Sequence, residues 1–390
     1  AVELQPADTV LTMLRLSLLV QALWHAAANA EEVSSDPKVL PTFEINLDLP
    51  PRERWKHVAS HYRSWWDENW ERMVATEQQV DEDTAKQLKK LASLLNYGHE
   101  IHEEMRGMIE AMNHPEATYE RLLQAQVGYE LGGSQGFFCA SITATKKDTH
   151  VVHGRNLDTK PEFVWGRSAA YELVFIKWGR KIARAVSGTG YLGLHTGMRL
   201  DNGWTIAQNT RFMMIKEGDG ERMANRKEWL DVMIKSAAAG GKPSGLGVRE
   251  LLLTQPTFHG AVAASTTWPW MAPQYHIIAG AGPYQGAVVT VEPTTHWGFP
   301  ARPNIQTLSA GAGRWLLVQT NDDHWKNPLD SRRMAATQGI TNEWKKHGID
   351  EEGVMQTLRM PPVCNDGTVW TWVTQPHLNS HTLNMGECYR

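Results

Sequence analysis

The sequence predicts an α+β fold, in which a mainly helical leader precedes a body of short strands and helices. Between residues 87 and 112, apolar side chains recur mostly every three or four positions among lysines and glutamates, which is the period of an amphipathic helix. From residue 139 onward, short β-branched runs are separated by Gly, Pro, Asn and Asp, as strands are separated by turns. These two patterns distinguish the leader from the body.

Further elements follow from local patterns. In the leader, a helix is expected to begin near Pro51, because proline is favoured in a first helical turn, and another is expected over residues 116–130. In the body, strands are expected over residues 141–145, 151–153, 172–176, 275–279, 287–292, 315–319 and 368–373. Helices are expected over residues 227–239, 247–254, 331–347 and 351–358. This order predicts much antiparallel sheet.

The first 30 residues have the pattern of a secretory signal. A basic start at Arg15 precedes a mostly apolar run over residues 16–24, and an Ala-Asn-Ala exit ends at Ala30. The apolar run is shorter than the roughly 20 residues that cross a bilayer. An amphipathic helix is the alternative interpretation. We therefore expect residues 1–30 to be upstream sequence and a signal, 31–138 to be the leader, and 139–390 to be the body.

Composition narrows the class of protein. The 390 residues are 42% hydrophobic, which suffices for a sizeable core. Lysine and arginine number 39 against 43 acidic residues, and they form no cluster with interleaved aromatics, so nucleic-acid binding is disfavoured. Histidines and cysteines lack the spacing of a metal site, and we expect neither a metal nor another cofactor.

The chain has three cysteines, Cys139, Cys364 and Cys388. The two near the C-terminus could pair in a secretory compartment. Cys139 is then left over, either as a buried core thiol or as a reactive one.

Cys139 stands at the start of one of two strand-like segments that flank a short polar turn, which predicts a β-hairpin. With a turn of residues 146–148, Cys139 faces Arg155 across the hairpin, at roughly 4.5–5.5 Å between Cβ atoms. An adjacent cation favours the thiolate form of cysteine. Asp158 can join the pair only if the strand ends or bulges, which the glycine and asparagine beside Arg155 permit.

These residues resemble the nucleophile hairpin of the cysteine N-terminal-nucleophile hydrolases. The runs Cys-Ala-Ser-Ile and His-Gly-Arg-Asn-Leu-Asp are most similar to the acid ceramidase and N-acylethanolamine-hydrolysing acid amidase family, and the choloylglycine (bile-salt) hydrolases are more distant. Several separate motifs in order are more specific than any single one. Other segments that resemble the family are Pro41–Pro50, Arg54-Trp55, Ser60–Tyr62, Met105–Met108, Met112-Asn113, Gly188–Gly197, Gln319–Lys326 and Asp330–Arg333.

The resemblance implies a fold and a chemistry. The fold is an αββα sandwich of two antiparallel sheets between helical layers, with the helical leader packed against it. The precursor cuts itself between Phe138 and Cys139, so that Cys139 gains a free α-amine, which serves as the base for its thiol. Arg155 would keep this amine neutral, and Asp158 would orient Arg155 and the amine.

The resemblance also assigns residues in the second half of the chain. Asn321 would donate its amide to the oxyanion, and Arg332 matches the family's second active-site arginine. Asn209 is a further candidate at the oxyanion. Beside it, Thr210 stands where the family usually has an acidic residue, which puts the efficiency of self-cleavage in question. The later run Asp219–Arg222 is a candidate source of the missing carboxylate.

Each of these residues also has an ordinary structural interpretation. A cysteine before a strand is usually a small core residue, and an Arg155–Asp158 contact alone would be a structural ion pair. Asn321 and its aspartates alone would form a turn, and Arg332 with its neighbour would lie on a solvated helix face. Only their ordered combination favours an active site. We expect His153 and His324 to be structural, because the family chemistry needs no imidazole.

The function implied is that of a lysosomal-type cysteine amidase acting on N-acylethanolamines or similar fatty acyl amides. A ceramidase is the first alternative and a non-catalytic lipid-binding pseudoenzyme is the second, the latter because of Thr210. We expect an acidic secretory compartment or secretion, transient contact with a membrane or lipid carrier, and leader and body segments held together non-covalently. Two tryptophan clusters, over residues 65–70 and 268–270, suit either core packing or a lipid-binding surface, and the second favours an acyl-channel wall that includes Met271.

Overall fold

The structure is a computed structural model that describes residues 40–77, 81–95, 97–132, 139–146, 150–159, 168–217, 220–295, 305–326 and 329–389. The expected signal over residues 1–30 and the cleavage residue Phe138 lie outside these ranges. Within them, no helix has the length and apolar character needed to cross a membrane.

The leader consists mainly of helices, as predicted. Its elements are β1 (Thr42–Asn46), η1 (Pro51–Glu53), α3 (Lys56–His61), α4 (Arg63–Glu77), α5 (Glu82–Leu94), α6 (Gly98–Met112), α7 (Tyr119–Ala125) and α8 (Gly128–Gly132). The periodic run over residues 87–112 is two helices, because Gly98 has a left-handed φ of +74° that interrupts the helical path.

The body alternates strands and helices over its whole length. Its strands are β2 (Ala140–Thr145), β3 (Val151–Asp158), β4 (Ala170–Lys177), β5 (Arg180–Gly188), β6 (Thr196–Arg199), β7 (Trp204–Thr210), β8 (Met214–Glu217), β9 (Gly220–Met223), β10 (Gln274–Gly280), β11 (Gly286–Val291), β12 (Ile305–Thr307), β13 (Leu316–Gln319), β14 (Thr368–Gln375) and β15 (Ser380–Asn384). Its helices are α9 (Arg226–Ala238), α10 (Ser244–Thr254), α11 (Phe258–Thr267), α12 (Ser331–His347) and α13 (Glu351–Arg359), with a short η3 (Pro376–Leu378).

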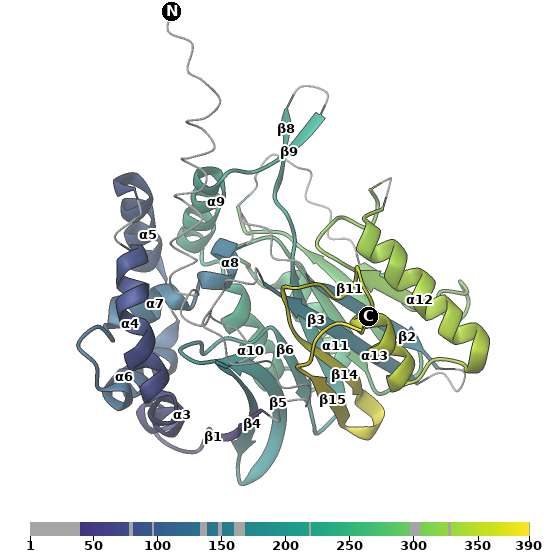
Figure 1. Cartoon of the computed structure of the whole chain (residues 1–390), viewed down its shortest axis with the longest axis horizontal. Helices are drawn as coiled ribbons and strands as arrows, with labels where there is room; N and C mark the ends of the chain where they lie inside the picture. The colour runs from purple at the N-terminus through teal and green to yellow at the C-terminus, as the bar shows by residue number, and fades with distance from the viewer. Residues whose placement is uncertain are drawn as a thin grey trace, which may run out of the picture.

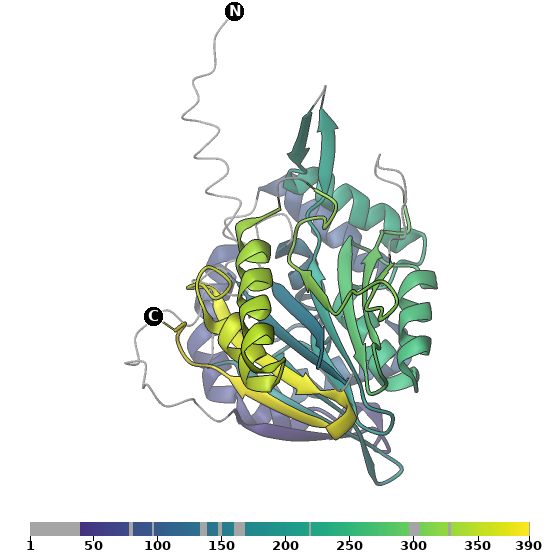
Figure 2. The same ribbon diagram turned by 90° about the vertical axis from the view of Figure 1, so that its right-hand side faces the viewer.

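Two sheets face each other between two helical layers (Figures 1 and 2). The larger sheet has the order β1-β4-β5-β6-β7-β10-β11-β12, and the smaller has the order β13-β2-β3-β14-β15. Helices α10 and α11 contact the larger sheet, α12 and α13 contact the smaller one, and β2 touches β7, β10 and β11 across the interior. This is the expected αββα sandwich, with one exception: β1 pairs in parallel with β4.

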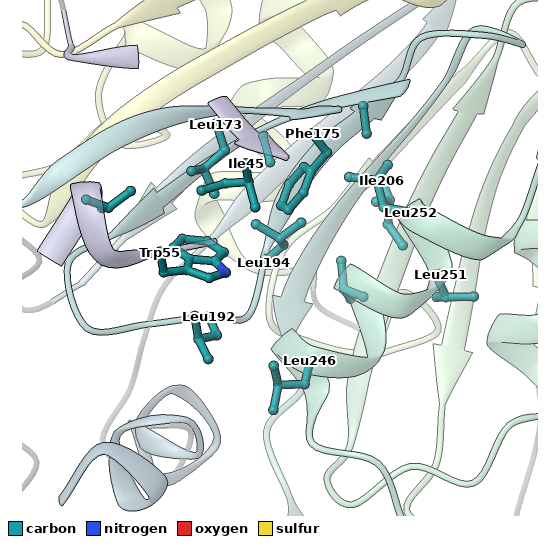
Figure 3. Close-up of a cluster of buried hydrophobic side chains, with 14 of the residues drawn as sticks. Ile45, Trp55, Leu173, Phe175, Leu192, Leu194, Ile206, Leu246, Leu251 and Leu252 are labelled. Carbon is teal, nitrogen blue, oxygen red and sulfur yellow. The ribbon is translucent and has the colours of Figure 1, made fainter. Parts of the chain in front are cut away.

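The leader is built into the body by β1 and by the largest hydrophobic cluster. Ile45 of β1 and Trp55 pack with Leu173 and Phe175 of β4 and with leucines of α10 (Figure 3). Removing this apolar surface from water stabilises the assembly by roughly 25 cal/mol per Å² buried. The leader therefore forms part of the core.

The hairpin register differs from the prediction. The N–H of Lys146 donates to the carbonyl of His150 (2.7 Å), so the turn closes one residue later than expected. Arg155 consequently lies opposite Ser141, and Cys139 lies on the diagonal. Diagonal neighbours are within reach of a long side chain, so Arg155 still contacts the sulfur.

The tryptophan clusters lie largely in the interior. Trp66 and Trp70 are stacked on each other at 4.9 Å and are at most 5% exposed. Trp270 donates its indole N–H to the carbonyl of Ser265 (3.0 Å), and both Trp270 and Met271 belong to hydrophobic clusters. Packing accounts for the buried Trp66, Trp70, Trp270 and Met271, while Trp268 is partly buried, and an acyl channel beside it stays a prediction.

Candidate active site

The sulfur of Cys139 lies in the interior, directly before β2. The Nη2 of Arg155 donates to Sγ at 3.0 Å, and the hydroxyl of Tyr129 lies 3.4 Å from Sγ. Arg155 is held by bonds from Nη1 to the carbonyl of His195 (2.6 Å) and to Thr196 Oγ1 (2.8 Å). Since Arg155 is 1% exposed, water screens its charge little, so a buried cation faces the sulfur.

The backbone of Cys139 is held by two side chains. Its N–H donates to Asn321 Oδ1 at 2.7 Å, and its carbonyl accepts from Arg332 Nη1 at 3.0 Å. Arg332 Nη2 also donates to Asn321 Oδ1 (3.0 Å), which links the two. Asn321 follows β13, and Arg332 lies in the first turn of α12. Two elements far from Cys139 in the sequence therefore meet at its backbone.

Asp158 is placed differently from the expectation. It is buried at the end of β3, where β14 has a register irregularity, and it accepts from Thr368 (2.7 Å) and from Asn365 (3.3 Å). Asp158 pairs with Arg332, whose Nη1 lies 3.8 Å from Oδ2, whereas Arg155 is bonded to His195 and Thr196. Burial raises the pKa of Asp158 to about 6, against the opposing effect of Arg332. Asp158 therefore orients the second arginine.

Sequence reasoning missed the group that supports Arg155. His195 and Gln208 are joined by a side-chain bond of 2.5 Å, and the ring of Tyr129 stacks on His195 at 3.8 Å. Burial and the nearby Arg155 lower the pKa of His195 to about 3, so this imidazole is neutral. The motif Gly188–Gly197 contains His195, but nothing in its spacing places it beside Cys139.

Asn209 joins the two sheets. Its Oδ1 accepts from Ser141 Oγ (3.0 Å) and its Nδ2 donates to the carbonyl of Gln319 (2.9 Å). The carbonyl of Thr210 accepts from Asn321 Nδ2 at 2.8 Å. The Asn321 amide, which was expected to donate to an oxyanion, therefore donates to a main-chain oxygen in this structure.

Carboxylates near Thr210 come from other elements. Arg211, the next residue, bonds Asp323 at 2.6 Å and Glu292 at 2.5 Å. Glu221 of the run over residues 219–222 does not take this place, because it is exposed on the β8–β9 ribbon, which projects from the body (Figure 1). Asp219 lies outside the described residues.

Two histidines near the site have structural contacts. His153 Nδ1 bonds Thr205 Oγ1 at 2.7 Å, and burial lowers its pKa to about 3. His324 Nδ1 lies 3.3 Å from Gln319 Oε1, and burial with the nearby Arg333 lowers its pKa to about 4. Both imidazoles are therefore neutral at pH values well above these pKa values.

The remaining cysteines form a disulfide, Cys364–Cys388, so Cys139 is the chain's free thiol. Among the described residues, no group of three or more His, Cys, Asp or Glu side chains could hold a metal ion. The arrangement around Cys139 combines a nucleophile, two guanidinium groups and an amide, which together suit acyl transfer through a thioester.

Comparisons with known proteins show which proteins this chain resembles. Residues 38–65 match the family model described as the beta subunit of N-acylethanolamine-hydrolyzing acid amidase. The chain is 28% identical to that amidase of Mus musculus over 351 residues, which cover 86% of each protein. It is also 28% identical to acid ceramidase of Homo sapiens over 361 residues, covering 85% of this chain and 82% of the ceramidase.

A solved structure extends the similarity to the fold. The Caenorhabditis elegans ortholog of N-acylethanolamine-hydrolyzing acid amidase superposes with a TM-score of 0.51 at 26% identity. The match covers 61% of this chain and 93% of the other.

Proposed function

Because the chain belongs to the acid ceramidase and N-acylethanolamine-hydrolysing acid amidase family, we propose that it hydrolyses the amide bond of N-acyl lipids with Cys139 as nucleophile. The observation that carries the proposal is the bond from Arg155 to the Cys139 sulfur, with Asn321 and Arg332 on the backbone of the same residue.

The first reaction is self-cleavage. The Cys139 thiolate attacks the carbonyl carbon of the preceding peptide bond, the C–N bond breaks, and the α-amine leaves with a proton. Water then hydrolyses the thioester, releasing the leader carboxylate and the thiol. Asn321 and Arg332 support this role, because they bind the backbone N–H and carbonyl of Cys139.

The second reaction repeats the same steps on a lipid amide. The α-amine of Cys139 takes the thiol proton, the thiolate attacks the acyl carbonyl, and the leaving amine receives the proton. An ordinary α-amine has a pKa near about 7.7 and would be protonated in an acidic compartment. Arg155 and Arg332 counter this, since nearby cations favour the neutral amine. We infer action in a lysosome or another acidic secretory compartment.

Direct assay separates the two candidate substrates. An N-acylethanolamine is our first candidate, because Thr320–Trp325, with His324 before Trp325, resembles the amidase more closely. The ceramidase relative is 28% identical over a similar length, so ceramide is the second. We expect purified protein at acidic pH to release more fatty acid from N-palmitoylethanolamine than from ceramide. A preference for ceramide would reverse the assignment, and release from neither would support the pseudoenzyme.

The turn between β4 and β5 is our candidate for membrane contact. It lies at the lower edge of the molecule in Figure 1, and its Trp178 is 79% exposed with a left-handed φ of 52°. Such backbone costs a residue other than glycine roughly 1–2 kcal/mol, and solvated indole adds a further cost. Tryptophan favours a membrane interface, where burial of the indole would offset the cost of its exposure.

The surroundings of Trp178 have the charge for an anionic lipid surface. Lys177 Nζ lies 4.8 Å from its ring, and Arg180 and Lys181 follow at once. The acidic neighbours already have partners. Glu44 pairs with Lys181 (3.0 Å), and Asp48 accepts a hydrogen bond from the N–H of Gly179 (3.2 Å). Lys177 also lines a cavity of about 760 Å³ between α6 and α10. Docking of this turn on a membrane would therefore place the cavity beside the lipid surface.

We expect Arg180→Ala to bind vesicles that contain phosphatidylglycerol about fivefold more weakly, the value of one lost surface cation. Trp178→Ala should also bind more weakly, because it loses the indole that favours the interface. Vesicle sedimentation measures this binding. Met334→Ala, which trims an exposed apolar side chain on the outer helix α12, is the control and should bind as wild type. Equal binding by all variants would exclude the turn as the docking element.

A further inference from the structure

One side chain of the leader touches the reactive sulfur. Tyr129 lies in α8, on the other side of the cleavage point from Cys139, and its hydroxyl is 3.4 Å from Sγ and 3.4 Å from the carbonyl of Gln208. A hydroxyl has one proton, so it can donate to only one of these two acceptors at a time. When the sulfur is a thiol, Tyr129 can donate to Gln208 and accept from the S–H.

When the sulfur is charged, the preferred acceptor of the Tyr129 hydroxyl changes. A thiolate is an ionised acceptor and attracts a hydroxyl proton more strongly than a neutral carbonyl does. Burial raises the pKa of Tyr129 well above its usual value, so the hydroxyl keeps its proton and stays a donor. Rotation about the C–O bond is enough to redirect it.

The same pair of residues positions both donors to the sulfur. The carbonyl of His195 accepts from Arg155, and the imidazole of His195 stacks on the Tyr129 ring. The N–H of Gln208 donates to the carbonyl of His195 (2.8 Å), and the carbonyl of Gln208 faces the Tyr129 hydroxyl. The two residues His195 and Gln208 therefore contact both donors to the sulfur.

We propose that Tyr129 is a second hydrogen-bond donor to the Cys139 thiolate, so that the leader remains part of the active site after cleavage. This inference rests on the proposed function, since it adds a residue to the same nucleophile. It assigns the leader a role beyond that of a removable segment. Loss of the leader from the cleaved protein would then remove a donor from the nucleophile.

The test compares Tyr129→Phe with Tyr191→Phe. Tyr191 also stacks on His195, at 5.0 Å, and is buried as well, so it is a matched control for loss of a buried hydroxyl. The pH dependence of Cys139 alkylation by iodoacetamide reports thiolate formation directly, because Cys139 is the free thiol. A second measurement is kcat/KM for N-palmitoylethanolamine.

For Tyr129→Phe we expect the alkylation midpoint to move about one to two pH units higher, and kcat/KM to fall about tenfold or more, as for a lost hydrogen bond to a charged group. Tyr191→Phe should match wild type in both measurements. An unchanged midpoint in Tyr129→Phe, or equal shifts in both variants, would overturn the inference. If the midpoint shifts but even wild type hydrolyses no lipid, the proposed function fails while Tyr129 keeps its role. If wild type remains uncut, the same alkylation is made on the precursor, which already has the contact.

Discussion

Cys139→Ala is expected to abolish both self-cleavage and lipid hydrolysis. The side chain supplies the nucleophile for both reactions, and no neighbouring group can replace a sulfur that forms the thioester. The fall in kcat should be about 10⁴-fold or more, as when other covalent nucleophiles are removed. Gel electrophoresis after incubation at acidic pH measures cleavage, and fatty-acid release measures turnover.

A matched control lies four residues along the chain. Thr143 is buried, and its Oγ1 has no hydrogen-bond partner, so Thr143→Val removes a hydroxyl from the same region without changing the shape of the side chain. This variant should cleave and turn over like wild type. Turnover by Cys139→Ala would mean that Cys139 is not the nucleophile assigned here, whereas an inactive Thr143→Val of native stability would show that the loss is not specific to the sulfur.

Glu104→Gln is expected to lower the free energy of unfolding by about 3–5 kcal/mol, the cost of removing one partner from a buried ionic group. Glu104 in α6 is fully buried and accepts from Arg249 of α10 at 2.6 and 2.8 Å, and from Arg54 at 3.1 Å. It therefore joins the leader to the body. The substitution removes the carboxylate that pairs with the buried Arg249, and it leaves Arg54 with only the exposed Glu100, at 3.2 Å.

Urea unfolding at fixed pH measures this effect, and size-exclusion chromatography of the cleaved protein measures retention of the leader. The control is Glu103→Gln, one residue away, which loses only pairs with the half-exposed Arg52 and Arg106 and should change little. Equal stability of the two variants would show that the buried group does not hold the segments together.

Much of the architecture follows from the sequence because its signals are local. The helix over residues 331–347 and the strands near residues 141–145 and 275–279 have clear periodicity and clear ends, and the structure has elements at these places. Strands β5 and β7 were missed. Their residues are buried on nearly all faces, so they lack the alternation that identifies a half-exposed strand.

The site is harder to predict because its contacts are long-range. The hairpin placed Arg155 near Cys139 despite the wrong register, since one long side chain spans the difference. Local pattern could not find Tyr129, whose hydroxyl reaches the sulfur only because α8 and β7 meet in the folded chain. Asp158 was assigned to Arg155 on one strand, whereas the ion pair comes from Arg332 of a distant helix.

The most direct test of the central claim is the intact mass of the purified chain before and after acidification, with N-terminal sequencing of the products. The account predicts two fragments, one ending at Phe138 and the other beginning at Cys139, that appear together with lipid-amide hydrolysis. A chain that stays uncut yet hydrolyses the amide, or one cut at another bond with full activity, would contradict it.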